Sequence, residues 1–239
     1  MQKLEVIFLD KVKKILESVK SEGRKVLMEH EATEIFKAYG IVVPKEGVAT
    51  SEVEVLKIAR HVGYPVVLKI ESPDIQHKTD AGAVILNLAT AEDILKGYRK
   101  VIENSKKYKP DADIRGVIVQ HMMPKNREVI IGVSKDKQFG HVVMFGLGGI
   151  FVEVLKDVSF RIVPIEKEDA YSMIYEIRSH QMLCGVRGEK PSDVDALADI
   201  IIKISNLVSD FPEIKELDIN PVFVYEKGAV AVDALIVLD

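Results

Sequence analysis

The sequence predicts an α+β fold, a mixed α/β arrangement, that is divided into two lobes. Up to about residue 113, segments with the apolar periodicity of helices alternate with short apolar runs that are typical of strands. From about residue 114, strand-like runs follow one another, with two helical segments among them. We therefore expect a first lobe at about 41–113 and a second at about 114–239, with a separate N-terminal helix within 1–24.

Four helices are predicted in the first half of the chain, where apolar residues recur at helical spacing. Ser51 and Thr90 are suitable N-caps for the third and fourth helices, and Gly40 and Gly63 are suitable stops for the second and third. The helices are expected at 8–19, 26–40, 51–63 and 90–108, and the strands at 41–50, 64–70 and 83–88.

Charged and apolar residues alternate along parts of the second half, as in antiparallel strands with one covered face. Strands are expected at 115–122, 127–136, 141–149 and 159–164. Helices are expected at 166–179 and 192–211, with Ser192 as the N-cap of the latter. The chain should end in a hairpin over 214–238 whose turn is "EKG".

Composition excludes several classes of protein. A formal net charge of −4 gives no reason to expect nucleic acid or an acidic membrane as a partner. The single cysteine, Cys184, excludes an intramolecular disulfide and a thiolate metal cage, which favours a reducing compartment. Charges recur in every turn of the first 23 residues, so this segment predicts neither a signal peptide nor a spanning helix. We expect a cytoplasmic protein.

Two candidate residues lie in and just after the predicted strand at 64–70. Lys69 is surrounded by apolar neighbours, and a lysine in a buried strand is costly unless its ammonium meets an anion; the alternative is a strand end from which it reaches solvent. His77 lies in the loop "SPDIQHKTDAG", and a neutral imidazole is a competent nucleophile toward phosphorus. The alternative for His77 is an ordinary exposed loop histidine.

The segment "FGLGGIFVEV" places Gly148 and Gly149 just after a predicted strand. Glycines allow close approach of the backbone, and successive amides can bind an oxyanion. The segment lacks the GxxxxGK[ST] pattern, so a tight turn is the alternative interpretation.

The C-terminal hairpin carries candidate metal ligands. Asp218 and Asn220 alternate along one strand and so share a face, and the "EKG" turn would bring Asp233 on the partner strand close to Asn220. Carboxylate and amide oxygens are ligands that Mg²⁺ accepts, with phosphate oxygens and waters completing the shell. The alternative is a polar outer face, and Pro221 argues against an ordinary central strand.

Four stretches resemble one family: "EHEATEIFKAYGIVVP", "YPVVLKIESPDIQHKTDAGAV", "FGLGGIFVEVLKDVSFRIVP" and "ELDINPV". From about Val26 to Asp239 the chain is similar to the nucleotide-binding β subunits of the ADP-forming acyl-CoA synthetases, in particular those of ADP-forming acetate–CoA ligase. It resembles the β subunit of succinyl-CoA synthetase less closely, because that subunit has a glycine-rich loop in place of "SPDIQHKTD" and continues into a further domain. The resemblance implies an ATP-grasp domain over 25–239, with two lobes that clasp a nucleotide.

The resemblance also implies roles for individual residues. Lys69 would meet nucleotide phosphates, the glycine loop at Gly148 and Gly149 would supply backbone amides there, and Arg161 is a further phosphate contact. The residues implied to bind adenine are Gln120, His121, Met122 and Met123, and Glu128 corresponds to an acidic residue at the nucleotide. Asn220 and Asp233 would hold Mg²⁺. His77 matches a phosphorylated histidine of the family, and Asp218 matches an acidic residue that orients a phosphohistidine.

The activity implied by the resemblance is acetyl-CoA + ADP + phosphate ⇌ acetate + ATP + CoA, with ATP and ADP as substrates and Mg²⁺ as cofactor. A phosphohistidine on a partner α subunit would pass its phosphoryl group through His77 to Mg-ADP. No GxGxxG fingerprint follows a predicted strand, so CoA is expected to bind to the α subunit of an α2β2 heterotetramer. The alternatives are a subunit of a succinate- or aryl-acid–CoA ligase, and a nucleotide-sensing regulatory subunit.

Overall fold

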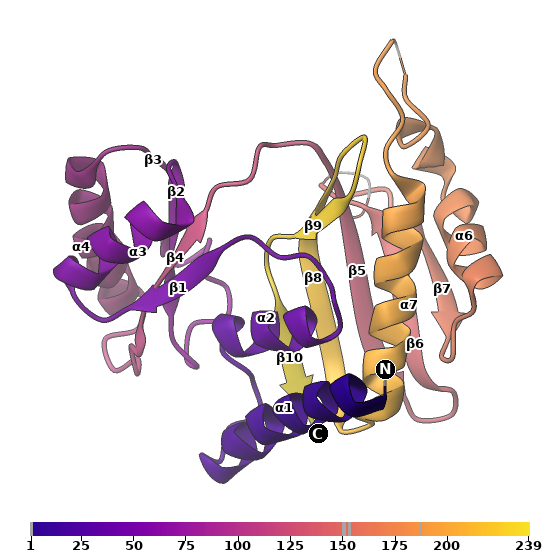
Figure 1. Cartoon of the computed structure of the whole chain (residues 1–239), viewed down its shortest axis with the longest axis horizontal. Coiled ribbons are helices and arrows are strands. Elements are labelled where there is room, and N and C mark those ends of the chain that lie inside the picture. Colours follow the sequence, from indigo (N-terminus) through magenta and orange to yellow (C-terminus); the bar gives the residue numbers. More distant parts are fainter. Residues whose placement is uncertain (1, 150–151, 153, 187) are drawn as a thin grey trace. The chain divides into compact units, whose positions relative to one another are not determined.

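The computed structural model describes residues 2–149, 152, 154–186 and 188–239 (Figure 1). The chain forms two compact units. The larger unit consists of Met1–Leu27, Ala32–Val43 and Lys125–Asp239, and the smaller unit consists of Met28–Glu31 and Pro44–Pro124. Within the described residues, no helix combines the length and the apolar character that a membrane crossing requires.

The smaller unit is an antiparallel sheet with two helices packed on it. Its strands lie in the order β1 (Glu46–Ala49), β4 (Gly116–His121), β2 (Val66–Glu71) and β3 (Val84–Leu88). Helices α3 (Glu52–Val62) and α4 (Ala91–Tyr108) contact these strands and begin at the predicted N-caps, Ser51 and Thr90, whose side chains accept backbone hydrogen bonds. Every residue of β2 is buried, which confirms that Lys69 lies within an apolar strand.

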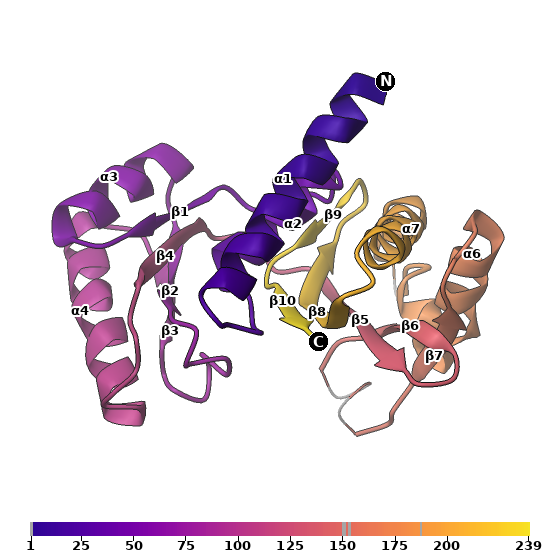
Figure 2. The same ribbon diagram turned by 90° about the horizontal axis from the view of Figure 1, so that it is seen from below.

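The larger unit contains a six-stranded antiparallel sheet with helices along one face. The strand order is β10 (Leu235–Leu238), β8 (Ile214–Val224), β5 (Arg127–Asp136), β6 (Gly140–Leu147) and β7 (Val158–Ile162), and β9 (Ala229–Ala231) also pairs with β8. Figure 2 shows helices α1 (Gln2–Ser21), α2 (Glu29–Ala38), α6 (Lys167–Glu176) and α7 (Val194–Asp210) on the same side of these strands. A short 3-10 helix, η1 (Arg178–Met182), follows α6.

The alternation of side chains along β5 defines the two faces of this sheet. Val129, Ile131 and Val133 belong to the core that the helices cover, so they point to what we call the helix face. Glu128 and Gly132 point to the opposite side, which we call the second face. This alternation decides which of the predicted site residues lie on the same side of the sheet.

The lobe boundary differs from the sequence-based expectation. It lies at Pro124 rather than near residue 113, because β4 pairs with β1 and β2 and therefore belongs to the smaller unit. The N-terminal helix is not separate: Val12, Leu16 and Val19 of α1 are buried in the core of the larger unit. Apolar periodicity predicted that a helix exists here, but it does not say what the apolar side of the helix packs against.

Two local features also differ from the prediction. The N-cap of α7 is Asp193, whose carboxylate accepts a hydrogen bond from the backbone N–H of Ala196, whereas the predicted cap, Ser192, accepts one from Arg127. The second arm of the C-terminal hairpin is divided into β9 and β10. Pro221 lies in β8, a central strand, and the sheet accommodates it through a register shift opposite Val129 and Ile131.

Candidate functional site

Lys69 meets an anion inside the smaller unit, as the buried strand required. Its Nζ lies 2.6 Å from Oε1 of Glu29, the first residue of α2, and the Glu29 side chain has no exposed surface. The other oxygen of Glu29 lies 3.0 Å from Nζ of Lys78 in the loop after β2. Glu29 therefore stands between two ammonium groups, one in the strand and one in the loop that carries His77.

The loop 72–83 is tethered to α4 and its following turn at both ends. Asp74 accepts hydrogen bonds from Nζ of Lys109 at 3.0 Å and from the backbone N–H of Asp113 at 2.7 Å. Asn104 donates from Nδ2 to the carbonyl of Gly82 at 2.6 Å. Ile75 is also buried, whereas His77, between the tethers, is exposed. The loop can be followed in Figure 2 between β2 and β3. Because the His77 side chain is exposed, its imidazole is accessible from solvent.

The segment from Gln120 to Met123 uses part of its polar capacity within the smaller unit. Gln120 is fully buried, and its side chain donates to Glu46 at 2.9 Å. The backbone N–H groups of His121 and Met122 donate to the carbonyls of Lys45 and Pro65. If the backbone of this segment binds a base, it would therefore do so through the N–H of Met123 and through carbonyl oxygens. These are fewer groups than the four residues that the resemblance implied.

In the larger unit, Asp218 and Asp233 lie close together on the second face. Burial raises the pKa of Asp218 to about 6, and the neighbouring Asp233 carboxylate contributes to that increase. Val222 pairs with Ala231 and Asp218 pairs with Leu235, and continuation of this register places Asn220 opposite Asp233. The predicted juxtaposition of Asn220 and Asp233 thus follows from the strand pairing, although Asp233 lies in the break between β9 and β10.

These residues fit a divalent cation. No group of three or more His, Cys, Asp or Glu side chains suited to a metal occurs in the part of the chain that the structure describes. Mg²⁺, however, is commonly held by one or two carboxylates while phosphate oxygens and waters complete its shell. The Asp233 carboxylate raises the pKa of Asp218 by charge repulsion, and a cation bound between the two carboxylates would relieve that repulsion.

Glu128 and the glycine loop are in direct contact in the larger unit. The backbone N–H of Gly148 donates to the carbonyl of Glu128 at 2.7 Å, and a Cβ atom on Gly148 would lie 2.9 Å from Cβ of Glu128. Gly148 is therefore required for close packing, and its amide is already engaged. Because the Gly148 amide is engaged, an amide that binds an anion here would have to be that of Gly149 or of a later residue. Gly149 has a φ of +64°, a conformation that favours glycine. Ile150 and Phe151 lie outside the described residues.

Arg161 does not join this group. It pairs with Val143, a core residue of the helix face, and its guanidinium donates to Ser172 and Glu176 of α6. Asp218 lies on the second face, so the sheet separates the two side chains. This arrangement therefore gives no support to the phosphate contact that was expected of Arg161. The resemblance identified the residue in the sequence, but it did not determine the face of the sheet to which the side chain points.

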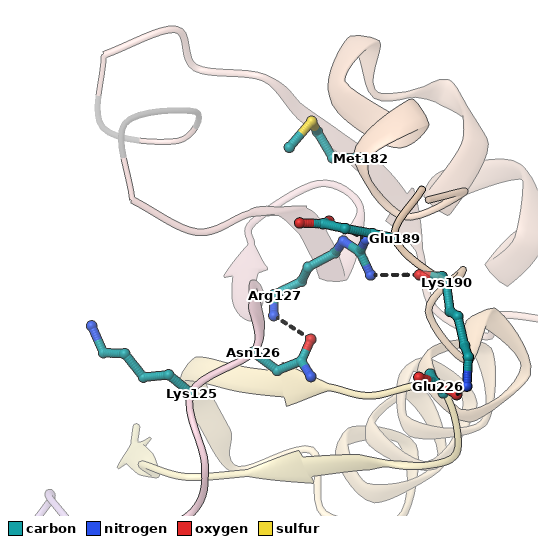
Figure 3. Close-up of a pocket in the computed structure, with 7 residues that line it drawn as sticks. All are labelled: Lys125, Asn126, Arg127, Met182, Glu189, Lys190 and Glu226. Atoms are coloured by element: carbon teal, nitrogen blue, oxygen red, sulfur yellow. Dashed lines mark hydrogen bonds and ion pairs between the residues drawn. The ribbon is translucent and has the colours of Figure 1, made fainter. Parts of the chain in front are cut away.

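The sequence analysis missed three charged residues. Glu29 and Lys78 complete the ion network of Lys69, and a buried lysine alone did not identify them. Arg127, adjacent to Glu128 but on the other side of β5, borders a pocket of ≈ 570 Å³ (Figure 3), whose lining residues are Lys125, Asn126, Arg127, Met182, Glu189, Lys190 and Glu226. Arg127 is bound there to Glu189, Ser192 and the carbonyl of Lys190.

Comparisons with known proteins identify the family of this chain. A family model described as an ATP-grasp domain matches residues 18–238. The β subunit of ADP-forming acetate–CoA ligase I from Pyrococcus furiosus is 54% identical over 228 residues, which cover 95% of this chain and 98% of that protein. An ADP-forming 4-hydroxybutyrate–CoA ligase from Nitrosopumilus maritimus is 49% identical over 91% of this chain and 31% of its own length.

A solved structure is also similar. It is the dinucleotide forming acetyl-coenzyme A synthetase 1 of Ca. Korarchaeum cryptofilum, in complex with coenzyme A and Mg-AMPPCP, with its phosphohistidine segment pointing towards the nucleotide binding site. The TM-score is 0.84 at 42% identity, and the match covers 95% of this chain and 100% of that chain.

Proposed function

Because the chain belongs to the ATP-grasp family, and within it to the β subunits of the ADP-forming acetate–CoA ligases, we propose that it catalyses the nucleotide half of the reaction acetyl-CoA + ADP + phosphate ⇌ acetate + ATP + CoA. The imidazole of His77 accepts a phosphoryl group from a phosphohistidine of a CoA-binding α subunit. It then transfers this group to Mg-ADP. The working enzyme is a cytoplasmic heterotetramer of two α and two β subunits.

The observation that carries the proposal is the placement of His77. Its ring is exposed between two tethered loop ends, and the next residue, Lys78, shares Glu29 with Lys69. The similar Korarchaeum enzyme has a phosphohistidine segment that points towards its nucleotide site. An exposed imidazole on a loop whose next residue is a lysine is suited to carry a phosphoryl group, since phosphoryl transfer depends mainly on positioning and on cations that spread the charge.

The transfer through His77 has two balanced steps. In the first, the P–N bond of the partner's phosphohistidine breaks as a ring nitrogen of His77 forms a new P–N bond. In the second, a β-phosphate oxygen of ADP attacks phosphorus, which forms the P–O bond of ATP and returns the electron pair to His77. Lys69 binds phosphate oxygens, and Asp218 orients the phosphohistidine. Asn220 and Asp233 would hold Mg²⁺, which would neutralise charge on the nucleotide phosphates.

Labelling tests the proposal directly. ATP radiolabelled in its γ-phosphate, with Mg²⁺, should give an acid-labile, base-stable phosphoprotein, and His77→Ala should abolish the label and net ATP synthesis while ADP affinity stays within about twofold. The control is His61→Ala, which removes an exposed histidine of α3 in the same unit and should leave labelling unchanged. Nucleotide binding without any label on the unmodified chain would instead identify a regulatory nucleotide sensor.

A second candidate concerns the acid. The 4-hydroxybutyrate–CoA ligase is 49% identical to this chain, close to the value for the acetate–CoA ligase subunit. Similar nucleotide domains therefore occur in ligases for different acids, so the acid is chosen elsewhere in the enzyme. Steady-state assays of the assembled enzyme with acetyl-CoA, succinyl-CoA and an aryl-CoA measure the preference, and a dominant non-acetyl substrate would replace acetate in the proposal.

A further inference from the structure

Glu29 holds the strand lysine and the loop lysine at the same time. Its two carboxylate oxygens lie 2.6 Å from Nζ of Lys69 and 3.0 Å from Nζ of Lys78. The Glu29 side chain has no exposed surface, and only 13% of the Lys78 side chain is exposed. The contact between Glu29 and Lys78 is therefore largely desolvated, unlike the pairs on the outer surface of α4.

This contact lies at the middle of the loop. The ends of the loop are fixed by Asp74 and by the carbonyl of Gly82, and Lys78 is in the stretch between them. The same stretch contains a turn with three backbone hydrogen bonds. The N–H of Ala81 donates to the carbonyl of His77, that of Gly82 to Thr79, and that of Ala83 to Lys78. An ion pair at Lys78 therefore restrains the segment that positions the His77 backbone.

We propose that Glu29 and Lys78 form an ionic latch that holds the His77 loop in its docked position, and that a phosphoryl group on His77 opens this latch by drawing Lys78 away from Glu29. The first half of the proposal concerns the unmodified chain alone. The second half rests on the proposed function, because it requires His77 to carry phosphate. Glu29 and Lys78 are thus positioning residues for the relay.

The charges explain why the latch would open. Glu29 carries a single negative charge that two ammonium groups share. A phosphorylated side chain carries a charge of about −1.5 to −2 and three acceptor oxygens near neutral pH. On His77 this group is attached to the residue next to Lys78, so it competes for the Lys78 ammonium while Lys69 continues to neutralise Glu29. The modification itself then loosens the loop at the moment when the phosphoryl group has to move.

Hydrogen exchange tests the latch without nucleotide. Lys78→Gln should speed hydrogen exchange of the Ala81 and Gly82 amides about tenfold. This corresponds to a decrease of about 1.4 kcal/mol in the free energy of local opening, which is typical of the interaction energy between residues in one network. Lys78→Arg should restore protection. The control is Lys107→Gln, which breaks a 2.6 Å ion pair on the exposed surface of α4. Exchange equal to that of the Lys107 variant would overturn the latch. Glu29→Gln is unsuitable because it also removes the carboxylate that Lys69 binds.

Phosphorylation tests the opening. The chain without substitutions is phosphorylated on His77 with Mg-ATP and then freed of nucleotide. Its Ala81 and Gly82 amide hydrogens should exchange as fast as those of Lys78→Gln. Labelled protein whose loop stays as protected as before would overturn the opening. A chain that takes no label would contradict the proposed function instead, while the comparison of the unlabelled variants would still decide whether the latch exists. The two failures are therefore distinguishable.

Discussion

The substitution Glu29→Gln should destabilise the smaller unit far more than its conservative chemistry implies. The Glu29 side chain has no exposed surface, and its partner Lys69 is 5% exposed. Removal of one member of a buried ion pair costs about 3–5 kcal/mol, because it leaves the other charge desolvated. Glutamine keeps an acceptor oxygen near Nζ of Lys69, so we expect the lower end of that range, about 3 kcal/mol.

The control is Glu92→Gln on α4. Glu92 and Lys96 also lie 2.6 Å apart, but their side chains are 77% and 70% exposed. An exposed pair of this kind contributes little, so the control should change the free energy of unfolding by less than about 0.5 kcal/mol. The two substitutions remove the same charge, and the difference between them measures the combined effect of burial and of the second partner of Glu29, Lys78.

Urea unfolding followed by circular dichroism gives the free energies by linear extrapolation. For a chain of this size a loss of 3 kcal/mol corresponds to a fall in Tm of about 6–12 °C. A Glu29→Gln protein that is as stable as Glu92→Gln would refute the reasoning, since the carboxylate would then not be needed to compensate the charge of Lys69.

Three further predictions follow from the geometry. The Glu71 side chain raises the pKa of His30, so the stability from their contact is complete below about pH 6.5 and is lost as pH rises through the raised pKa. His30→Asn should therefore lower the free energy of unfolding by up to about 1 kcal/mol at pH 6 and by less at pH 9. An equal loss at both pH values would contradict this. Gly148→Ala places Cβ against Glu128 and should cost about 1–3 kcal/mol, measured by urea unfolding, and an unchanged midpoint would exclude the close contact. Asp233→Asn should weaken Mg²⁺-dependent ADP binding at least tenfold in calorimetry, and unchanged Mg²⁺ dependence would exclude the metal site.

Sequence reasoning was most successful where one local cause acts alone. The N-caps Ser51 and Thr90 were predicted correctly because a side-chain oxygen satisfies the first backbone amides of its own helix. For Ser192 the same reasoning failed, because Arg127 binds its hydroxyl and Asp193 supplies the cap instead. A competing partner that is distant in the sequence leaves no local signal.

The candidate site shows the same limit. The pattern of β2 predicted that Lys69 needs an anion, but the anion proved to be Glu29, forty residues earlier in the chain. The placement of Asn220 opposite Asp233, which follows from the pairs on either side of them, was predictable because a hairpin fixes register by its turn. The face of Arg161 was not predictable, since it depends on the pairing of β7 with β6 and on the position of α6.

Two groups of charges in this chain are better explained by function than by stability. Loss of one member of a buried ion pair is costly, but replacement of both members by apolar residues is often neutral or stabilising, so stability alone does not require an ion pair at Lys69 and Glu29. Burial of Asp218 beside Asp233 is likewise unfavourable, as the raised pKa of Asp218 shows. Departures from local rules concentrate at functional sites. Arg161, by contrast, is separated from Asp218 and Asp233 by its position, because its guanidinium binds Ser172 and Glu176 of α6 on the helix face.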